Sequence, residues 1–438
     1  MKKTICIVGG KKTFEHLTRI LLALGLKVIN ENTEGKIKRL SRLKSTGLFI
    51  LDLGSLKKGK LKSKLFRVLS ESGKKFIVLA SGATFDVVRE AREAGAADCI
   101  IKPYNQREFI SRFNAVLNNK RRISCIGGGT GIFHLLLGLK SLPGVLLTSI
   151  VNTTDDGGSS GRLKASLGIL PPGDVRRSLV ALSNAPEMMN KVMLYRFRKI
   201  EGLAGHSLGN LFLTALTDIN RSFSKAVKAI GDIMNIQGIV QAVAKDPTTL
   251  FALFEDGTVI KGESMIDIGK GRNLKLRIKK VWHEPPIQCS VEAFSSIINS
   301  DIVILGPGDL FTSIITNVLV KNINSALAET KAKKIYICNL MTKPGETPGY
   351  DACDHVREIV KYTGGGRLDY VIISNTKLSK KAMREYAGKG QIPVKAGDTD
   401  EIRRMAKGQI ILSDVGDSTD LVRHNEPKIR KAIKAILS

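Results

Sequence analysis

The chain has 438 residues, more than the roughly 100–150 of a typical single domain, so we expect at least two domains. Hydrophobic residues make up 43% and charged residues 25%, a balance that excludes a largely disordered chain. No apolar run approaches the roughly 20 residues that cross a bilayer, and the N-terminal MKKTICIVGG has too short an apolar stretch for a secretory signal. We therefore expect a cytoplasmic protein without a membrane span.

The formal net charge is +29, and more than half of the excess lies within residues 1–122. The densest basic stretch runs from Lys36 to Lys75 and includes Lys57, Lys58, Lys60, Lys62 and Lys64. Such a stretch can attract nucleic acid or an anionic surface. Few aromatic residues are interleaved and no nucleic-acid motif is present. We therefore expect a solvated lysine-rich surface, with binding of an anionic surface or of nucleic acid through this basic N-terminal region as a weaker alternative.

The cysteines are scattered and form no CxxC pair, which argues against a zinc site or a disulfide framework. They are Cys6, Cys99, Cys125, Cys289, Cys338 and Cys353. We expect buried, reduced thiols.

Within residues 1–119, short apolar runs alternate with segments of helical period. Strands are expected at 4–8, 26–30, 48–52, 76–80 and 98–101, and helices at 13–24, 35–43, 60–72, 84–94 and 106–117. Strands and helices in strict alternation predict a doubly wound parallel sheet.

The segment AREAGAADCIIKPYNQREFISRFNAVL resembles the last third of a CheY-like response-regulator receiver domain. The resemblance places Asp52 at the position of the phosphorylated aspartate. Receivers hold Mg²⁺ with two acidic residues after the first strand, whereas this chain has Gly9-Gly10-Lys11-Lys12, which lacks the oxygen ligands that magnesium prefers. We interpret residues 1–119 as a pseudo-receiver that is not phosphorylated and that serves dimerisation or docking of a protein partner. The alternative is an appendage that only preserves the fold.

A polar, basic run at residues 120–122 is the expected linker, and residues 123–438 begin a second α/β domain. A strand at 123–126, a helix at 132–141 and a strand near 145–152 precede a long polar loop that extends to about residue 174. Helices are expected at 174–184, 188–199 and 207–218, a β-rich insertion at 249–291, and then strands and helices in alternation to a helical tail at 426–437. This pattern predicts a larger, Rossmann-like doubly wound domain with a small β-rich insertion.

The first strand of this domain ends in the loop Gly127-Gly128-Gly129-Thr130-Gly131. Glycines let backbone amides approach a ligand, and the following helix N-terminus suits a phosphate. The loop is neither a complete GxGxxG motif nor a P-loop, so by itself it is a weak signal and equally fits a tight structural turn.

The second strand leads into the loop Asp155-Asp156-Gly157-Gly158-Ser159-Ser160. Two adjacent carboxylates repel each other, so they need a cation, a donor-rich ligand or solvent. An acidic residue after the second strand of a doubly wound fold commonly binds a ribose hydroxyl. We interpret this loop as part of a ligand site, with a solvated polar turn as the alternative.

Further polar loops follow other strands or precede helices. Their candidate ligand-binding residues are Gly173, Asp174, Arg176, His206, Asn210, Gly306, Gly308, Thr312, Ser313, Asn339, Met341, Thr342, Glu346 and Thr347. Asp174 equally fits a helix cap, and a single histidine such as His206 is more often structural. Loops at several strand C-termini converge on one crevice in an open α/β sheet, and this convergence predicts a phosphate-bearing, nucleotide-like ligand.

The segments GGGTG, DDGGSSGRL, PPGD, GHSLGN, GPGDLFTSI and NLMTKPGET, in this order, resemble the YvcK family of gluconeogenesis factors, a branch of the CofD-like superfamily. The resemblance covers residues 123–438. It implies a domain that binds a nucleotide sugar, UDP-N-acetylglucosamine, and that supports carbon-flux control and cell-envelope and cell-shape maintenance. The enzymatic branch of the superfamily, 2-phospho-lactate transferase, implies instead a Mg²⁺-dependent transfer in which Asp155 and Asp156 would serve the metal or the acceptor.

Three residues depart from the family pattern: Arg177 stands where Asn is usual, Asp309 where Ser is usual, and Thr316 where Pro is usual. The Asp309 carboxylate would repel a phosphate unless a cation or Arg177 compensates it. We interpret the chain as a non-catalytic sensor of a nucleotide sugar, with the transferase as the alternative. We assign no catalytic residue, metal or cofactor, and Mg²⁺ is the cofactor that the alternative would require.

Overall fold

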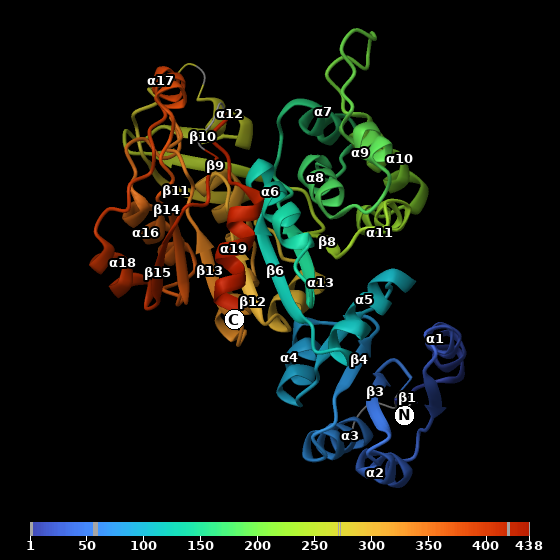
Figure 1. The fold of residues 1–438 in the computed structure, drawn as a ribbon. Helices are drawn as coiled ribbons and strands as arrows, with labels where there is room; N and C mark the ends of the chain where they lie inside the picture. Colours follow the sequence, from blue (N-terminus) through green and yellow to red (C-terminus); the bar gives the residue numbers. More distant parts are fainter. Residues whose placement is uncertain (1–2, 56–59, 270, 272, 418–420, 438) are drawn as a thin grey trace. The chain divides into compact units, whose positions relative to one another are not determined.

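The computed structural model describes residues 3–55, 60–269, 271, 273–417 and 421–437, which fall into two units (Figure 1). The first is formed mainly by the chain up to Arg122, and the second by most of the remainder. Lys57 and Lys58 of the predicted basic stretch lie outside the described residues. Within these ranges, no helix is long and apolar enough to cross a membrane.

The first unit is built on a parallel sheet with the strand order β2-β1-β3-β4-β5. Its strands are β1 (Thr4–Val8), β2 (Lys27–Asn30), β3 (Thr46–Asp52), β4 (Phe76–Ala80) and β5 (Asp98–Ile101). Its helices are α1 (Lys11–Ala23), α2 (Glu34–Arg42), α3 (Lys60–Glu71), α4 (Phe85–Glu93) and α5 (Gln106–Leu117). This is the doubly wound order of receiver domains, so the predicted fold of this region is confirmed.

The second unit contains a seven-stranded sheet with the order β15-β14-β13-β12-β6-β7-β8, whose described pairings are parallel. Its strands are β6 (Arg121–Gly127), β7 (Val145–Val151), β8 (Ile239–Ala242), β12 (Ile302–Leu305), β13 (Lys333–Ile337), β14 (Tyr370–Ser374) and β15 (Gln409–Ser413). Successive strands run outward in opposite directions from the β6–β12 pair. That pair is therefore the topological switch point, where doubly wound sheets bind ligands at the strand C-termini.

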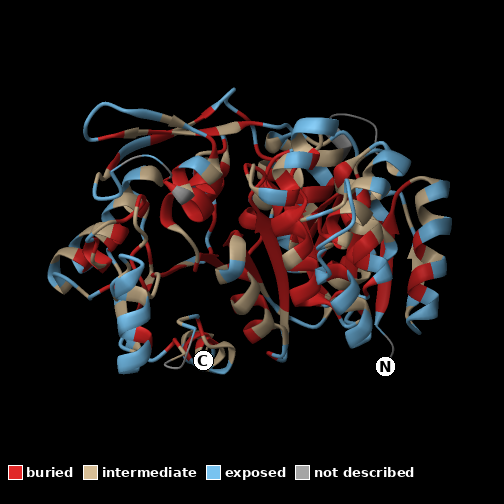
Figure 2. Cartoon of the chain, turned by 90° about the horizontal axis from the view of Figure 1, so that it is seen from above, coloured by how far each residue is buried: buried red, intermediate tan, exposed pale blue. Residues whose placement is uncertain are grey.

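Helices connect and cover these strands. They are α6 (Gly129–Lys140), α7 (Gly158–Leu167), α8 (Gly173–Leu182), α9 (Glu187–Leu194), α10 (Leu208–Asn220), α11 (Phe223–Ile233), α13 (Val291–Ile298), α14 (Thr316–Val318), α15 (Ile323–Glu329), α16 (Ala352–Tyr362), α17 (Lys380–Gly388), α18 (Thr399–Ala406) and α19 (Glu426–Leu437). In Figure 2 the buried residues concentrate in the strands and the exposed residues on the outer faces of helices. This segregation follows from burial of the apolar strand residues.

The predicted β-rich insertion is a three-stranded antiparallel sheet of β9 (Thr249–Phe254), β10 (Val259–Lys261) and β11 (Ile278–Glu284), in the order β10-β9-β11. The Asp256-Gly257 turn joins β9 to β10, as its sequence predicts. A short helix, α12 (Glu263–Ile268), lies between β10 and β11.

The structure corrects several expectations. The loop that was expected to extend to about residue 174 contains α7. Its run of glycines and serines begins a helix with little apolar periodicity, so the sequence pattern did not indicate a helix there. Strand β6 begins at Arg121, so Arg121 and Arg122 of the expected linker lie in a strand. After β12, where the predicted alternation of strands and helices calls for a helix, the chain forms a π-helical segment, η1 (Leu310–Ile315), followed by α14.

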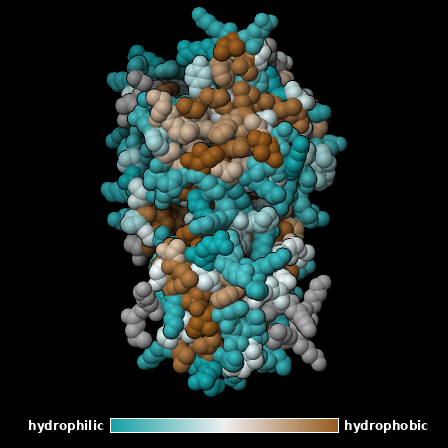
Figure 3. Space-filling view, turned by 90° about the vertical axis from the view of Figure 1, so that its right-hand side faces the viewer, coloured by the Kyte–Doolittle hydropathy of each residue, from teal (hydrophilic) through white to brown (hydrophobic). Residues whose placement is uncertain are grey.

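All six cysteines are buried and free, as predicted. Some large apolar side chains lie at the surface of the second unit. Met188, Tyr195 and Ile219, in or next to α9 and α10, are each more than half exposed (68%, 52% and 73%). Figure 3 shows apolar side chains gathered on the face that carries these helices.

Candidate functional site

A cavity of about 370 Å³ lies at the switch point, at the C-terminal ends of β6 and β12. Its volume falls in the range of about 300–1,000 Å³ typical of small-molecule sites. The predicted residues that line it are Gly128, Gly129, Thr130, Gly131, Asp155, Asp174, Gly308, Thr312, Ser313, Asn339, Met341 and Thr342. The structure therefore brings five of the six predicted loops to one cavity, which we call the switch-point cavity.

Glycine is required where these loops pack against each other. A Cβ atom on Gly131 would collide with the carbonyl oxygen of Pro307, and one on Gly128 would collide with the Asp174 carboxylate. Gly306 has a φ of +77°, a backbone conformation that residues other than glycine rarely adopt. The loops after β6 and β12 are thus interlocked, which fixes the backbone amides around the cavity.

Carboxyl groups from three segments lie close together on one side of the switch-point cavity: Asp155 after β7, Asp174 in α8 and Glu263 in α12. Burial, with the nearby Asp155 carboxylate, raises the pKa of Asp174 to about 6. Burial and the charges of Asp155 and Asp174 likewise raise the pKa of Glu263. Such a group of acids offers acceptors for ligand hydroxyl or amide groups.

Asp174 does not cap its own helix, since no side chain caps α8. Instead, the backbone N–H of Gly129 donates to the Asp174 carboxylate. Glu263 accepts hydrogen bonds from Asn152 Nδ2 at 3.0 Å and from Thr154 Oγ1 at 2.7 Å. Both acids are therefore held in place before any ligand binds.

The two adjacent acids of the second loop have different surroundings. Asp155 lines the cavity and accepts from the backbone N–H of Gly157 at 2.9 Å. Asp156 accepts from the backbone N–H groups of Glu263 and Ser264, at 3.1 and 2.8 Å, and so binds the N-terminus of α12. The sequence predicted one role for both, and the structure brings only Asp155 to the cavity.

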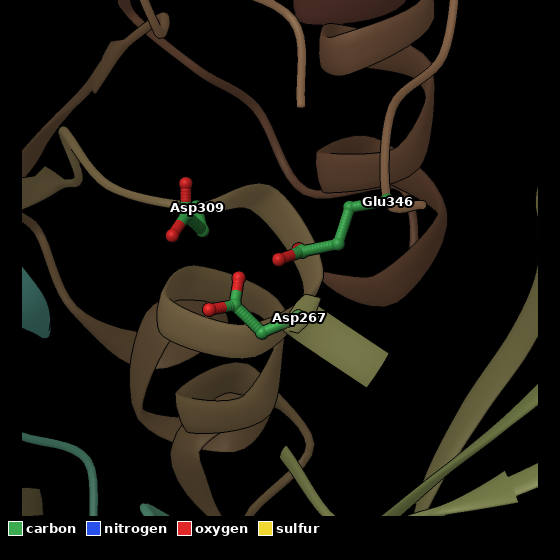
Figure 4. A group of neighbouring side chains, drawn as sticks. All are labelled: Asp267, Asp309 and Glu346. Atoms are coloured by element: carbon green, nitrogen blue, oxygen red, sulfur yellow. The ribbon is translucent and has the colours of Figure 1, made fainter. Parts of the chain in front are cut away.

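Figure 4 shows the carboxylates of Asp267, Asp309 and Glu346 directed toward one another. The ammonium of Lys343 forms ion pairs with all three, including one of 2.5 Å to Asp309 and one of 3.5 Å to Glu346. Arg177 instead donates to Thr130 Oγ1 at 3.3 Å. The cation that compensates the unusual Asp309 is therefore Lys343.

These three carboxylates, with ligand atoms within 4.8 Å of one another, are the one group in the described residues that could hold a metal ion. Glu346 also accepts hydrogen bonds from the N–H groups of Phe311 and Thr312, at 3.2 and 3.3 Å. Because Lys343 pairs with every member, the arrangement fits an internal ammonium rather than Mg²⁺. The predicted pair Asp155 and Asp156 does not belong to this group.

Other predicted residues lie on a second, smaller cavity beside the first. They are Gly157, Gly158, Ser159, Ser160, Gly173, Arg176 and Asn210. Asp155 and Asp174 line both cavities.

The remaining predicted residues line neither cavity. His206 Nδ1 lies 3.2 Å from Ser159 Oγ. Burial and nearby arginines lower the pKa of His206. Thr347 Oγ1 accepts from the backbone N–H of Lys343 at 3.0 Å, and Glu346 stabilises the start of η1. Gly127 and Gly306 lie in strand–loop junctions behind the lining. These positions are supporting ones, and their roles in ligand binding stay predictions.

Several residues that line the switch-point cavity were not predicted from the sequence: His134, Glu263, Asp267, Leu340, Lys343, Tyr386, Gln391, Val422, Arg423 and His424. Most of them come from segments without a glycine-rich motif. Arg423 precedes the tail helix α19, where a basic residue before a helix carries no distinctive pattern. Only the fold brings it to the cavity.

Comparisons with known proteins concern this same region. Residues 123–414 match the family described as 2-phospho-L-lactate transferase CofD. The gluconeogenesis factor of Bacillus subtilis is 39% identical over 323 residues, which cover 73% of this chain and 99% of that protein. The gluconeogenesis factor of Halalkalibacterium halodurans is 39% identical over 321 residues, covering 72% of this chain and 96% of that protein.

A crystal structure of a UPF0052-family protein from Bacillus halodurans is similar in fold, with a TM-score of 0.68 and 37% sequence identity. The similarity covers 72% of this chain and 99% of that one. The family match includes every residue of the second unit that we predicted to bind a ligand.

Proposed function

We propose that this chain, which belongs to the CofD-like family of gluconeogenesis factors, is a regulatory protein that binds a nucleotide sugar in the switch-point cavity. The observation that carries the proposal is the cavity itself, where glycine loops after β6 and β12 meet at the switch point. Backbone amides at a helix N-terminus suit a diphosphate, and Arg177 and Arg423 line the same cavity.

The acidic side of the cavity suits the rest of such a ligand. Asp155, Asp174 and Glu263 offer carboxyl oxygens to hydroxyl and N–H donors, which sugar and base moieties carry and a bare phosphate does not. UDP-N-acetylglucosamine has donors of both kinds and is the nucleotide sugar that we propose. A cavity lined by both carboxylates and arginines offers partners for the hydroxyl and N–H groups and for the phosphates of such a ligand.

The relatives named gluconeogenesis factors support a role in carbon-flux control, and we extend it to maintenance of the cell envelope and cell shape. A nucleotide sugar used in envelope synthesis would be a suitable signal for both. In this proposal the bound ligand changes a surface that a protein partner contacts, and the first unit provides a further surface for docking or self-association.

The test is titration calorimetry of the full chain with UDP-N-acetylglucosamine, UDP-glucose and GDP, each with and without Mg²⁺. Preferred, metal-independent binding of UDP-N-acetylglucosamine without turnover would support the sensor. The Arg423→Gln variant should bind it about 10- to 150-fold more weakly, since a charge-assisted hydrogen bond is worth about 1.5–3 kcal/mol. Equal affinity for all three nucleotides would contradict the proposal.

One observation favours the transferase as a second candidate. Asp174, whose pKa is raised to about 6, lies against the amides of the first glycine loop, where a proton could be exchanged with a ligand near neutral pH. Slow consumption of a nucleotide by the wild-type chain, abolished in Asp174→Asn, would establish this activity.

A further inference from the structure

We propose that the cavity at the N-terminus of α7 is an anion site that binds a phosphate group. It has a volume of about 230 Å³ and lies beside the switch-point cavity, with which it shares Asp155, Asp174 and Arg177. This volume is below the range of about 300–1,000 Å³ of sites for drug-sized ligands, so it fits a small group rather than a whole nucleotide.

Three guanidinium groups line this cavity: Arg176, Arg177 and Arg196. Among the described residues, no carboxylate lies within salt-bridge distance of any of the three. Arg176 is 5% exposed, and it donates from Nε to Asn210 Oδ1 at 2.8 Å and from Nη1 to the Met193 carbonyl at 3.2 Å. These partners are neutral, so a buried cation lacks a directly paired counter-charge.

The surroundings of Arg176 show the same imbalance. Burial, together with the charges of Arg177 and Arg196, lowers the pKa of Arg176 to about 10. Asp155 and Asp174 at the edge of the cavity oppose this effect, but they do not outweigh it. An anion held among the three arginines would relieve their mutual repulsion.

The start of α7 adds hydrogen-bond donors. No side chain caps this ten-residue helix, whose N-cap residue is Gly157, so its first backbone amides have no partner within the helix. The hydroxyls of Ser159 and Ser160 are buried in the same wall of the cavity (3% and 4% exposed). The Ser159 hydroxyl already contacts Ser207 N, Asn210 Nδ2 and His206 Nδ1, so its one hydrogen is directed at His206. The helix amides, the Ser160 hydroxyl and the arginines together form the donor set that phosphate oxygens accept from.

The phosphate group could come from two sources: a separate phosphorylated molecule, or a phosphate of the nucleotide sugar in the switch-point cavity. The anion site does not rest on the proposed function, because inorganic phosphate alone is the probe. We therefore test it first on the full chain without any nucleotide.

The experiment measures the affinity for inorganic phosphate by calorimetry at constant ionic strength. Arg196 is exposed, and it donates from Nη1 to the Gly205 carbonyl at 2.5 Å. Because the side chain lies at the surface, its replacement should leave the fold intact. Arg196→Gln should weaken phosphate binding about tenfold, as expected for loss of one charge-assisted contact. The matched control is Arg198→Gln, because Arg198 is also exposed and does not line the cavity. Arg196→Lys should recover part of the affinity.

The same titration on protein saturated with UDP-N-acetylglucosamine separates the two sources. Undiminished phosphate binding would indicate a separate phosphorylated ligand, whereas competition that depends on Arg196 would assign the site to the nucleotide sugar's own phosphate. Absence of phosphate binding in the wild type, or binding that Arg196→Gln leaves unchanged, would overturn the proposal. A failure of the nucleotide sugar to bind would overturn the proposed function and leave this result standing.

Discussion

The ammonium of Lys102 lies 2.8 Å from the carboxylate of Asp52 in the first unit. Asp52 also accepts hydrogen bonds from the hydroxyls of Thr13 and Ser55 and from the backbone N–H of Gly54. The carboxylate is 1% exposed, so all of its acceptor capacity is directed at these donors. The residue at the position of a phosphoacceptor is thus part of a saturated hydrogen-bond network.

This network predicts a structural role for Asp52. Burial alone would raise the pKa of Asp52, but the hydrogen bonds from Lys102, Thr13 and Ser55 outweigh it and lower the pKa. A lowered pKa contributes stability above the unfolded-state pKa of about 3.9, and this stability is lost as the pH falls through the folded-state value. Asp52→Asn should therefore lower the free energy of unfolding by about 1–3 kcal/mol at pH 7 and by less at pH 3.

Urea unfolding at both pH values would measure this difference. Asp86→Asn is the control, because the Asp86 side chain is 81% exposed and forms a surface ion pair with Arg89. An Asp52→Asn variant as stable as the wild type at pH 7 would contradict the role.

A second prediction concerns phosphorylation. Gly9 packs directly against Asp52, where a Cβ on Gly9 would lie 3.0 Å from Asp52 Cβ, and neither Gly9 nor Gly10 offers a carboxylate for Mg²⁺. Incubation with acetyl phosphate and Mg²⁺ should therefore leave the intact mass unchanged. A stable mass increase that Asp52→Asn abolishes would show an active receiver instead.

Asp155 and Asp156 should respond differently to substitution. Asp155→Asn removes a cavity carboxylate and should weaken ligand binding about tenfold without loss of stability, since it also relieves repulsion with Asp174 and Glu263. Asp156→Asn removes an acceptor at the start of α12 and should cost about 0.5–2 kcal/mol of unfolding free energy. Each variant is the control for the other, in parallel calorimetry and thermal unfolding. Equal effects in both assays would show that the two acids act together.

The raised pKa of Asp174 predicts a pH dependence of opposite sign to that of Asp52. Because the folded protein binds the proton more tightly, the Asp174 contribution to stability falls as the pH rises from about 4 to about 6. The difference in unfolding free energy between the wild type and Asp174→Asn should therefore shift in favour of the wild type by roughly 2–3 kcal/mol on acidification. Asp155→Asn should shift the pH range over which this stability changes to lower pH, because the Asp155 charge helps to raise the pKa of Asp174. A difference that is constant between pH 4 and pH 7 would argue against the raised pKa.

The sequence predicted the strand and helix order of the first unit closely, because each apolar run there is bounded by turn residues. For example, β4 and β5 have the expected bounds. It was less successful after β7, where α7 begins within a run of glycines and serines and buries only Ser159, Ser160 and Leu163. Local periodicity cannot reveal a helix with so few apolar contacts.

The candidate site could be predicted only in part for a related reason. Glycine loops at strand ends are visible in the sequence, and they do meet at the β6–β12 switch point. Glu263 and Arg423 reach the cavity from the β-rich insertion and the C-terminal segment, and nothing local marks them as neighbours of the Gly128 loop. The separate surroundings of Asp155 and Asp156 likewise depend on the position of α12, a tertiary feature.

Lys343 provides the last prediction. Its ammonium holds Asp267, Asp309 and the buried Glu346 together, so Lys343→Met leaves three carboxylates without their shared cation. The expected cost is about 1–3 kcal/mol at low salt, less than for a fully buried group because Asp267 and Asp309 are partly exposed. Three converging carboxylates without an ammonium would then suit a divalent cation. Millimolar Ca²⁺ or Mg²⁺ should therefore raise the melting temperature of Lys343→Met and leave that of the wild type unchanged. The double variant Lys343→Met with Asp309→Ser should lose this response, and equal stabilisation of wild type and variant would show that Lys343 does not fill the site.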